Sequence, residues 1–168
     1  MAILEILTYP NPILKKACAP VTDVNDELRK FLDDMLETMY QNAGIGLAAI
    51  QVGRLIRAIV VDIREDERGS SESKVHKLIN PEILEKEGSK KCEEGCLSVP
   101  GVREEVIRAE KIKVRALNEN GKKVEFIAEG LLAICIQHEI DHLDGILFVD
   151  RLSKLRRTMI KKKLNKLT

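Results

Sequence analysis

The chain has 168 residues, 44% of them hydrophobic and 33% charged, which suits one folded domain with its own core and excludes intrinsic disorder. Its longest apolar run, Leu131 to Ile136, is far shorter than the ~20 residues that a membrane span needs. The first residues lack the basic segment of a secretory signal, so we expect a cytoplasmic protein, one domain over residues 1–168, whose four cysteines are thiols or metal ligands.

The net charge of +1 is unevenly distributed along the chain. Residues 151–168 contain eight lysines or arginines and no acidic residue, so they carry +8 and residues 1–150 carry −7. A basic tail on an acidic body is either the solvated face of a helix or a surface for a phosphate-rich partner.

Two regular elements are predicted near the beginning of the chain. Apolar residues recur at three- and four-residue spacing from Val24 to Tyr40, which is typical of a helix with one buried stripe. Asn25 is its expected N-cap, and the pattern ends at Gly44. The β-branched run from Ile56 to Ile63 predicts a buried strand, and the charged, serine-rich residues 64–74 predict a solvated loop.

Short strands in hairpin-like order follow this loop. We expect two short strands between Val75 and Glu87, divided at Asn80-Pro81, and a tight turn with positive φ angles at Asn120-Gly121. The remaining expected strands are Val102 to Ala109, Lys111 to Leu117 and Lys123 to Ala128.

Two further helices are expected, an apolar one from Leu131 to Leu143 and a basic one at residues 153–167. Because the strands follow one another rather than alternating with helices, we expect an α+β fold. Its antiparallel β-sheets would pack around the central helix at residues 131–143, with an amphipathic helix at the N-terminal end and the basic helix at the C-terminal end. The apolar face of the basic helix would contain Leu155, Met159, Ile160, Leu164 and Leu167.

The central helix contains the segment His138-Glu139-Ile140-Asp141-His142. Histidines four residues apart lie on one face of a helix and can bind one metal ion. Glu139 adjoins the first of them, near enough to exchange protons with water that the metal activates. Because a buried helix does not normally carry two histidines and a glutamate without a function, we expect a metal site.

A third metal ligand is needed, and the residue types leave several candidates open. Cys96 is the best of them, because Gly95 before it lets the backbone approach closely. A closed structural site of two cysteines and two histidines would leave Glu139 without a role, and its spacing would differ from that of zinc fingers. The other candidates are Cys18, Cys92, Cys135, His76 and the carboxylates.

A glycine-rich segment, Gly44 to Gln51, precedes the first predicted strand. It lacks the Gly-Lys-Ser/Thr of a phosphate loop and follows a helix, so no nucleotide cofactor is expected. Its small residues would let another chain pass close to the backbone. Gln51 is its one polar side chain and must find a partner or serve as one.

Together these segments resemble the three sequence motifs of the peptide deformylase family. The glycine-rich motif that ends in glutamine corresponds to Gly44–Gln51, and the Glu-Gly-Cys-Leu-Ser motif corresponds to Glu94–Ser98. The Gln-His-Glu-x-Asp-His-Leu-x-Gly motif corresponds to Gln137–Gly145. Every motif position matches, and the resemblance extends along the whole chain to the helical C-terminal end of the bacterial form.

The resemblance implies a metal-dependent hydrolase that removes the formyl group from the N-terminal formyl-methionine of new proteins and releases formate. Glu139 would carry the proton from water to the departing amine, and the Gln51 side chain and the Leu97 backbone N–H would stabilise the oxyanion. One divalent metal ion is implied, natively Fe²⁺, although Zn²⁺, Ni²⁺ and Co²⁺ suit the same ligands. The implied ligands are Cys96, His138 and His142.

The expected substrate contacts lie on the central helix and in the glycine-rich segment. Leu131, Ile134 and Cys135 share the ligand face of the helix, so they would form an apolar pocket that suits methionine. Ile45 and Gly46 resemble the family positions that pair with the substrate backbone as an added strand. The expected partners are N-formylmethionyl nascent peptides and, through the basic C-terminal helix, the ribosome; no membrane partner is expected.

Two other functions remain open at this point. A zinc peptidase with the same His-Glu-x-x-His motif would need a glutamate or histidine ligand after His142, and no histidine follows. A non-enzymatic, metal-stapled module could bind the ribosome through its basic tail, but Glu139 would then have no role.

Overall fold

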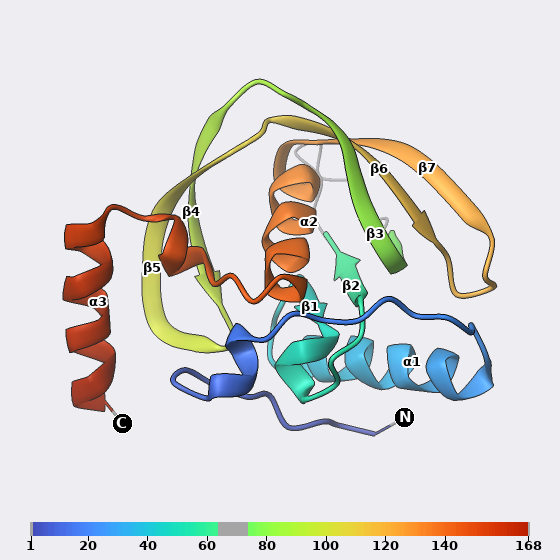
Figure 1. Cartoon of the computed structure of the whole chain (residues 1–168), viewed down its shortest axis with the longest axis horizontal. Helices are drawn as coiled ribbons and strands as arrows, with labels where there is room; N and C mark the ends of the chain where they lie inside the picture. Colours follow the sequence, from blue (N-terminus) through green and yellow to red (C-terminus); the bar gives the residue numbers. More distant parts are fainter. Residues whose placement is uncertain (1, 64–73, 168) are drawn as a thin grey trace.

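Two antiparallel sheets lie around one central helix in the computed structural model, which describes residues 2–63 and 74–167 (Figure 1). The helices are α1 (Asp26–Gln41), α2 (Gly130–Leu143) and α3 (Lys154–Leu167), with the short 3-10 helices η1 (Pro12–Lys15), η2 (Ala49–Val52) and η3 (Phe148–Arg151). The strands are β1 (Gly46–Ala48), β2 (Ala58–Asp62), β3 (Val75–Glu87), β4 (Lys90–Cys96), β5 (Val99–Arg108), β6 (Lys111–Leu117) and β7 (Lys123–Glu129). One sheet has the order β1-β2-β3-β6-β7, and β4 pairs with β5 in the other, which confirms the α+β fold.

Strand β2 is buried on both faces because helices pack on each side of it. Ile59 and Val61 belong to the apolar cluster that α2 completes, whereas Ala58 and Val60 pack in a second cluster with α1. Alternating side chains of a strand point to opposite faces, so a strand between two helices must be apolar at every position. The continuous apolar run of the sequence therefore reflects burial on both sides.

Helix α2 is enclosed in the core along most of its length. Every residue from Ala133 to Leu143 is buried, and Ile136, Ile140 and Leu143 are part of the core between α2 and the larger sheet. The five polar side chains among these buried residues must therefore find partners inside the protein.

Helix α1 begins as predicted and ends just after Tyr40, the last residue of its apolar pattern, rather than at Gly44. The side chain of Asn25 accepts a hydrogen bond from the Leu28 amide at 2.9 Å, which is the predicted N-cap. The helix ends at Gln41, because Ala43 adopts a positive φ of 55° that a right-handed helix cannot contain.

The prediction of two short strands around Asn80-Pro81 is wrong. Residues 75–87 form the single strand β3, and its register against β6 shifts between Ile79 and Glu82. Asn80 has a positive φ of 52°, and its side chain exchanges hydrogen bonds with the backbone of Val21 at 2.8 and 2.9 Å. Proline has no backbone N–H to donate to a neighbouring strand. The shift in register accommodates Pro81 at this point, so the strand continues past it.

The hairpin of β6 and β7 is confirmed, but its turn is longer than expected. Residues 118–122 separate the two strands, and only Gly121 has a positive φ, of 75°. The Asn118 side chain accepts hydrogen bonds from the amides of Asn120 and Lys122 at 2.9 and 3.1 Å. This capping stabilises a wider loop than the two-residue turn that Asn-Gly favours.

Strands β1 and β4 are absent from the predicted elements, and β5 begins at Val99 rather than at Val102. The expected solvated loop falls on residues 64–73, which lie outside the described residues, and on Lys74.

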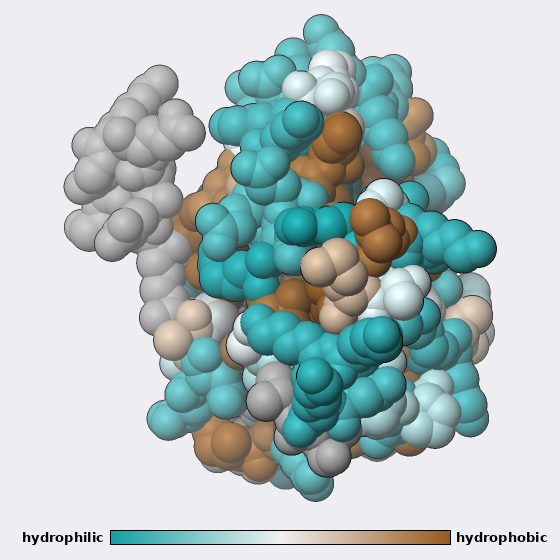
Figure 2. Space-filling view, turned by 90° about the vertical axis from the view of Figure 1, so that its left-hand side faces the viewer, coloured by the Kyte–Doolittle hydropathy of each residue, from teal (hydrophilic) through white to brown (hydrophobic). Residues whose placement is uncertain are grey.

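The C-terminal helix is confirmed as α3, but its predicted apolar face is wrong in part. Ile160 and Leu164 are buried against the cluster formed by β5 and η3, whereas Leu155 and Met159 are 71% and 55% exposed. Residues four apart form a narrow seam on a helix, and only that seam reaches the body. The outward face of the molecule on this side is largely hydrophilic, with a few hydrophobic side chains (Figure 2). No helix among the described residues is long and apolar enough to cross a lipid bilayer.

Candidate metal centre

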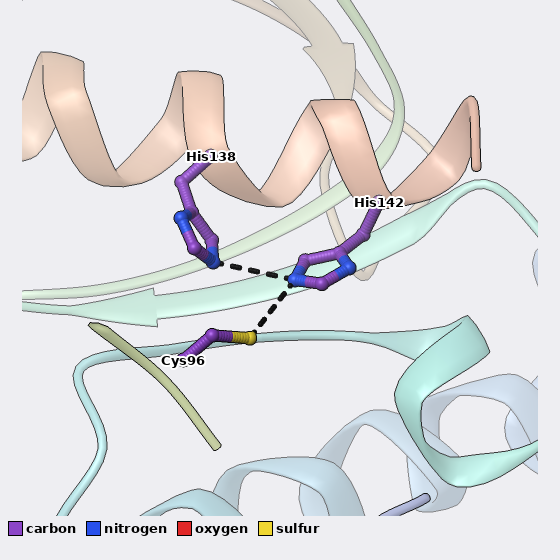
Figure 3. Close-up of side chains that lie close together, drawn as sticks. All are labelled: Cys96, His138 and His142. Carbon is purple, nitrogen blue, oxygen red and sulfur yellow. Dashed lines mark hydrogen bonds between the residues drawn. The ribbon is translucent and has the colours of Figure 1, made fainter. Parts of the chain in front are cut away.

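Three side chains from two distant segments converge at the centre of the molecule (Figure 3). His138 and His142 extend from one face of α2, and their Nε2 atoms are 3.2 Å apart. The Sγ atom of Cys96, at the end of β4, is 3.3 Å from Nε2 of His142. Both histidines are buried and Cys96 is half-buried, so the three donor atoms face one another at the inner end of the β4–β5 hairpin.

The donor set suits a divalent metal ion. One thiol sulfur and two imidazole nitrogens lie within 4.8 Å of one another, as the ligands of one ion must. Burial holds the pKa of His142 well below its usual value, so its ring stays neutral and keeps a lone pair for a ligand bond. A thiolate with two imidazoles is a donor set for transition metals rather than for Mg²⁺ or Ca²⁺.

Cys96 reaches this position because β4 and β5 form a hairpin. Leu97 and Ser98 make the turn, and Cys96 pairs with Val99 across it. The register of the hairpin shifts between Gly95 and Cys96, which bends the strand just before the cysteine. The turn therefore places the thiol beside α2 and the Leu97 backbone next to it.

A buried carboxylate orients His138. Oε1 of Glu94 accepts a hydrogen bond from Nδ1 of His138 at 2.8 Å, which leaves Nε2 free to face Cys96 and His142. Arg108 donates to both oxygens of Glu94, each at 2.9 Å. Burial alone would raise the pKa of Glu94, but the hydrogen bonds from His138 and Arg108 lower it, so this carboxylate stays ionised.

Glu139 differs from Glu94 because one of its oxygens has no partner. Its Oε1 atom is 3.8 Å from Nε2 of His138, whereas Oε2 is buried without a hydrogen bond to any described residue. Burial raises the pKa of Glu139 from 4.5 to about 7. A carboxylate with a free oxygen and a pKa near neutrality can both accept and return a proton.

Gln51 is held with its amide nitrogen directed toward the site. Its Oε1 atom accepts a hydrogen bond from the Ala48 amide at 2.9 Å, which defines the orientation of the side chain. Its Nε2 atom donates to Oγ of Ser98 at 3.0 Å and lies 3.5 Å from Sγ of Cys96. The buried Gln51 amide therefore finds its hydrogen-bond partner in Ser98, at the β4–β5 turn.

A pocket of about 400 Å³ opens above these residues. Leu131 and Ile45 are partly exposed at its walls, and Ile134 and Cys135 form the apolar part that lies on α2. His142 is not part of its lining and is fully buried. The predicted site residues that line the pocket are Ile45, Gly46, Gln51, Cys96, Leu97, Leu131, Ile134, Cys135, His138 and Glu139.

Strand β1 is the edge of the larger sheet beside this pocket. The Ile45 carbonyl accepts a hydrogen bond from the Asp62 amide at 2.9 Å, so the backbone of Ile45 points toward β2. Backbone groups alternate in direction along a strand, and those of Gly46 therefore face the open edge. A Cβ atom at Gly46 would lie 2.7 Å from Sγ of Cys135, so only glycine fits between the edge and α2.

Three residues of the site are not among those predicted from the sequence. Glu94 and Arg108 form the buried pair behind His138, and Arg103 lines the pocket with an ion pair to Glu93. The sequence contains a signal for the burial of Arg108. Arg108 lies an even number of residues after Val102 and Val106, so it is on the same, buried face of the strand. No comparable signal marks Arg103, which is exposed.

Comparison with known proteins agrees with this arrangement. A family model described as polypeptide deformylase matches residues 3–158. The chain belongs to the polypeptide deformylase family. It is 56% identical to a peptide deformylase of Alkalilimnicola ehrlichii over 167 residues, which cover 99% of this chain and 92% of that protein.

Solved structures of deformylases have the same fold. The peptide deformylase of Legionella pneumophila is 46% identical, with a TM-score of 0.88 over 99% of this chain and 95% of that one. The peptide deformylase of Ehrlichia chaffeensis in complex with actinonin is 40% identical, with a TM-score of 0.92 over 99% of this chain and 98% of that one.

Family membership makes the chain a metal-dependent hydrolase with deformylase activity on N-formylmethionyl peptides. The cluster of one cysteine and two histidines is consistent with the divalent metal ion that this activity needs. The zinc peptidase and the non-enzymatic module are not favoured.

The geometry predicts different effects for two cysteines of β4. We expect Cys96→Ser to lower metal affinity, because a neutral hydroxyl replaces a thiolate ligand. The loss should exceed the ~10–100-fold decrease that is typical when a residue hydrogen-bonded to a ligand is replaced. Cys92→Ser is the matched control, since Cys92 lines the pocket outside the donor cluster. Metal analysis of both purified variants measures the difference, and equal loss in both would contradict a ligand role specific to Cys96.

Proposed function

We propose that Cys96, His138 and His142 hold one divalent metal ion with which the chain hydrolyses the formyl group of N-formylmethionyl nascent peptides. The observation that carries this proposal is the unpartnered, buried Oε2 atom of Glu139 beside the three donor atoms. When bound, the metal supplies a Lewis acid that activates water and polarises the formyl oxygen. The products are formate and a peptide with a free amino group.

Glu139 acts as the proton carrier. With a pKa of about 7 it accepts a proton from the attacking water at neutral pH and returns it to the departing amine. Glu139 lines the pocket, and its Oε1 atom is 3.8 Å from Nε2 of His138, so the attacking water and the amide nitrogen of a bound substrate would be close to this carboxylate. General acid–base catalysis of this kind needs one residue with both protonation states accessible.

Two donors from different segments stabilise the developing oxyanion. The Nε2 atom of Gln51 lies beside Cys96 with its orientation held by Ala48, so it does not reorganise during the reaction. The backbone N–H of Leu97 is the second donor, at the turn that follows the cysteine.

The pocket selects the first residue of the substrate and the strand edge binds the main chain. Leu131, Ile134 and Cys135 surround the methionine side chain, whose unbranched thioether adapts to such an apolar wall. Gly46 offers its N–H and C=O to the substrate as an added strand, and the Ile45 side chain lines the pocket beside it. Main-chain pairing accepts many sequences after the methionine.

Replacement of Glu139 tests the mechanism directly. Glu139→Gln keeps the size and removes the proton carrier, so we expect kcat on a short formyl-methionyl peptide to fall by ~10²–10⁴ with metal content unchanged. Glu93→Gln is the control, because Glu93 lines the same pocket but is exposed. Turnover of Glu139→Gln near that of the unmodified protein would refute the mechanism.

The native ion is proposed to be Fe²⁺, as the family resemblance implies. We expect protein purified without oxygen to contain iron and to lose activity in air, because ferrous iron and its thiolate ligand both oxidise. Protein loaded with Ni²⁺ should keep its activity under the same exposure. Formate release and metal content measured over time check this, and equal persistence of the two forms would count against an iron centre.

Helix α3 is proposed to dock on the ribosome, which agrees with a cytoplasmic enzyme acting on emerging chains. Among the described residues, none forms an ion pair with the exposed Lys161, Lys162, Lys163 or Lys166. Arg156 instead pairs with Glu104 of β5, and the side chain of Arg157 is half-buried. The four lysines therefore direct uncompensated positive charge outward, where ribosomal RNA offers phosphate.

Charge reversal of these lysines tests the docking. The variant Lys161→Glu, Lys162→Glu, Lys163→Glu and Lys166→Glu spares the buried Ile160 and Leu164, so it should keep its activity on short formyl-peptides. We expect it to lose ribosome co-sedimentation at low salt, while the matched variant with four arginines keeps it. Unchanged co-sedimentation of a folded, active reversal variant would show that the helix is only solvated.

A further inference from the structure

An arginine outside the pocket is connected to the candidate metal site. Arg151, the last residue of η3, forms a two-pronged contact with Asp141 of α2. Its Nη2 atom donates to Oδ1 of Asp141 at 2.7 Å, and its Nε atom donates to Oδ2 at 3.1 Å. Planar pairing of this kind holds both side chains in one orientation.

The contact continues inward through Arg108 to the first histidine. Oδ2 of Asp141 also accepts a hydrogen bond from Nη1 of Arg108 at 2.5 Å. The other two donors of Arg108 bind the carboxylate of Glu94, which in turn accepts from Nδ1 of His138. A continuous series of charged hydrogen bonds therefore runs from Arg151 to a residue of the metal-binding cluster.

The series from Arg151 to Glu94 contains two carboxylates and two guanidinium groups. Glu94 and Asp141 contribute two negative charges, and Arg108 and Arg151 contribute two positive charges. Without Arg151, Arg108 would be the one ion-pair partner of the Asp141 carboxylate among the described residues. That carboxylate would then attract Arg108 more strongly, at the expense of the hydrogen bonds that Arg108 makes to Glu94.

We infer that Arg151 is a positioning residue for His138, acting through Asp141, Arg108 and Glu94. This inference rests on the proposed metal site and adds a residue that lies outside the three sequence motifs and outside the pocket. The side chain of Arg151 is 45% exposed, so the series connects the protein surface to the histidine. Its position three residues before α3 places that surface end at the junction with the C-terminal helix.

Arg57, just before β2, also pairs with an aspartate at the C-terminal end of α2 and provides a matched comparison. Arg57 pairs with Asp144 at the end of α2, with 2.9 Å between Nη1 and Oδ1. Among the described residues, the Arg57 side chain donates to Asp144 and to the Leu143 carbonyl, and neither contact links it to Arg108 or Glu94. Loss of either arginine removes one positive charge and one tether of α2, but only Arg151 belongs to the series that ends at His138.

The experiment compares Arg151→Met, Arg151→Lys and Arg57→Met as Co²⁺-loaded enzymes. Visible absorption of the Co²⁺ ion reports the arrangement of its ligands, and formate release from a short N-formylmethionyl peptide gives kcat and KM. We expect Arg151→Met to shift the Co²⁺ bands and to lower kcat by about 3- to 10-fold with KM little changed, less than the ~10–100-fold typical of residues that touch the ligand itself. Arg151→Lys should recover part of both changes.

Arg57→Met should leave the Co²⁺ bands and kcat unchanged. Identical changes in Arg151→Met and Arg57→Met, or an unshifted Co²⁺ spectrum in Arg151→Met, would overturn the inference and leave Arg151 as a simple tether. The spectrum separates this result from a failure of the proposed function. Absence of formate release by the unmodified enzyme would refute the function, while the band positions would still test the placement of His138.

Discussion

The carboxylate of Glu94, buried between Arg108 and His138, holds the centre of this molecule in place. It accepts two hydrogen bonds from the guanidinium and one from the imidazole, and all three side chains are nearly inaccessible to water. Removing one partner of a buried ion pair typically costs ~3–5 kcal/mol, because the remaining charge is left unpaired. Since the same carboxylate determines which nitrogen of His138 faces Cys96, the geometry of the candidate metal centre depends on that pair.

The burial of α2 has a chemical consequence as well as a structural one. The packing that encloses this helix in the core also buries the side chains of His142 and Glu139. Exclusion of water keeps His142 neutral and raises the pKa of Glu139 to about 7. The core and the catalytic chemistry therefore depend on the same apolar side chains.

The pocket exists because three segments that are distant in sequence meet at one place. β1 contributes an open strand edge, the β4–β5 turn contributes the thiol, and α2 contributes the histidines and the apolar wall. Helix α3 stands apart from the pocket and contacts the body through a narrow seam (Figure 1). Its four lysines from Lys161 to Lys166 are exposed, whereas Arg156 pairs with Glu104 of β5. Arg151 lies where these two parts of the molecule join.

The sequence by itself determined the features that depend on local spacing. The four-residue interval of His138 and His142 placed both rings on one face of a helix, and Asn25 marked the beginning of α1, because helix periodicity and capping are properties of neighbouring residues. The hairpin of β6 and β7 was equally evident from its alternation. β1 is too short, and β4 too charged, to carry a periodic signal.

Other features were decided only by tertiary structure. Spacing placed Leu155, Met159, Ile160 and Leu164 on one side of a helix, but packing against β5 and η3 selected the two that are buried. The pairing of Glu94 with Arg108 and the contact of Arg151 with Asp141 join separate elements. A charged residue is stable in the interior only where a distant partner meets it, and that meeting is determined by the fold rather than by the interval between residues along the chain.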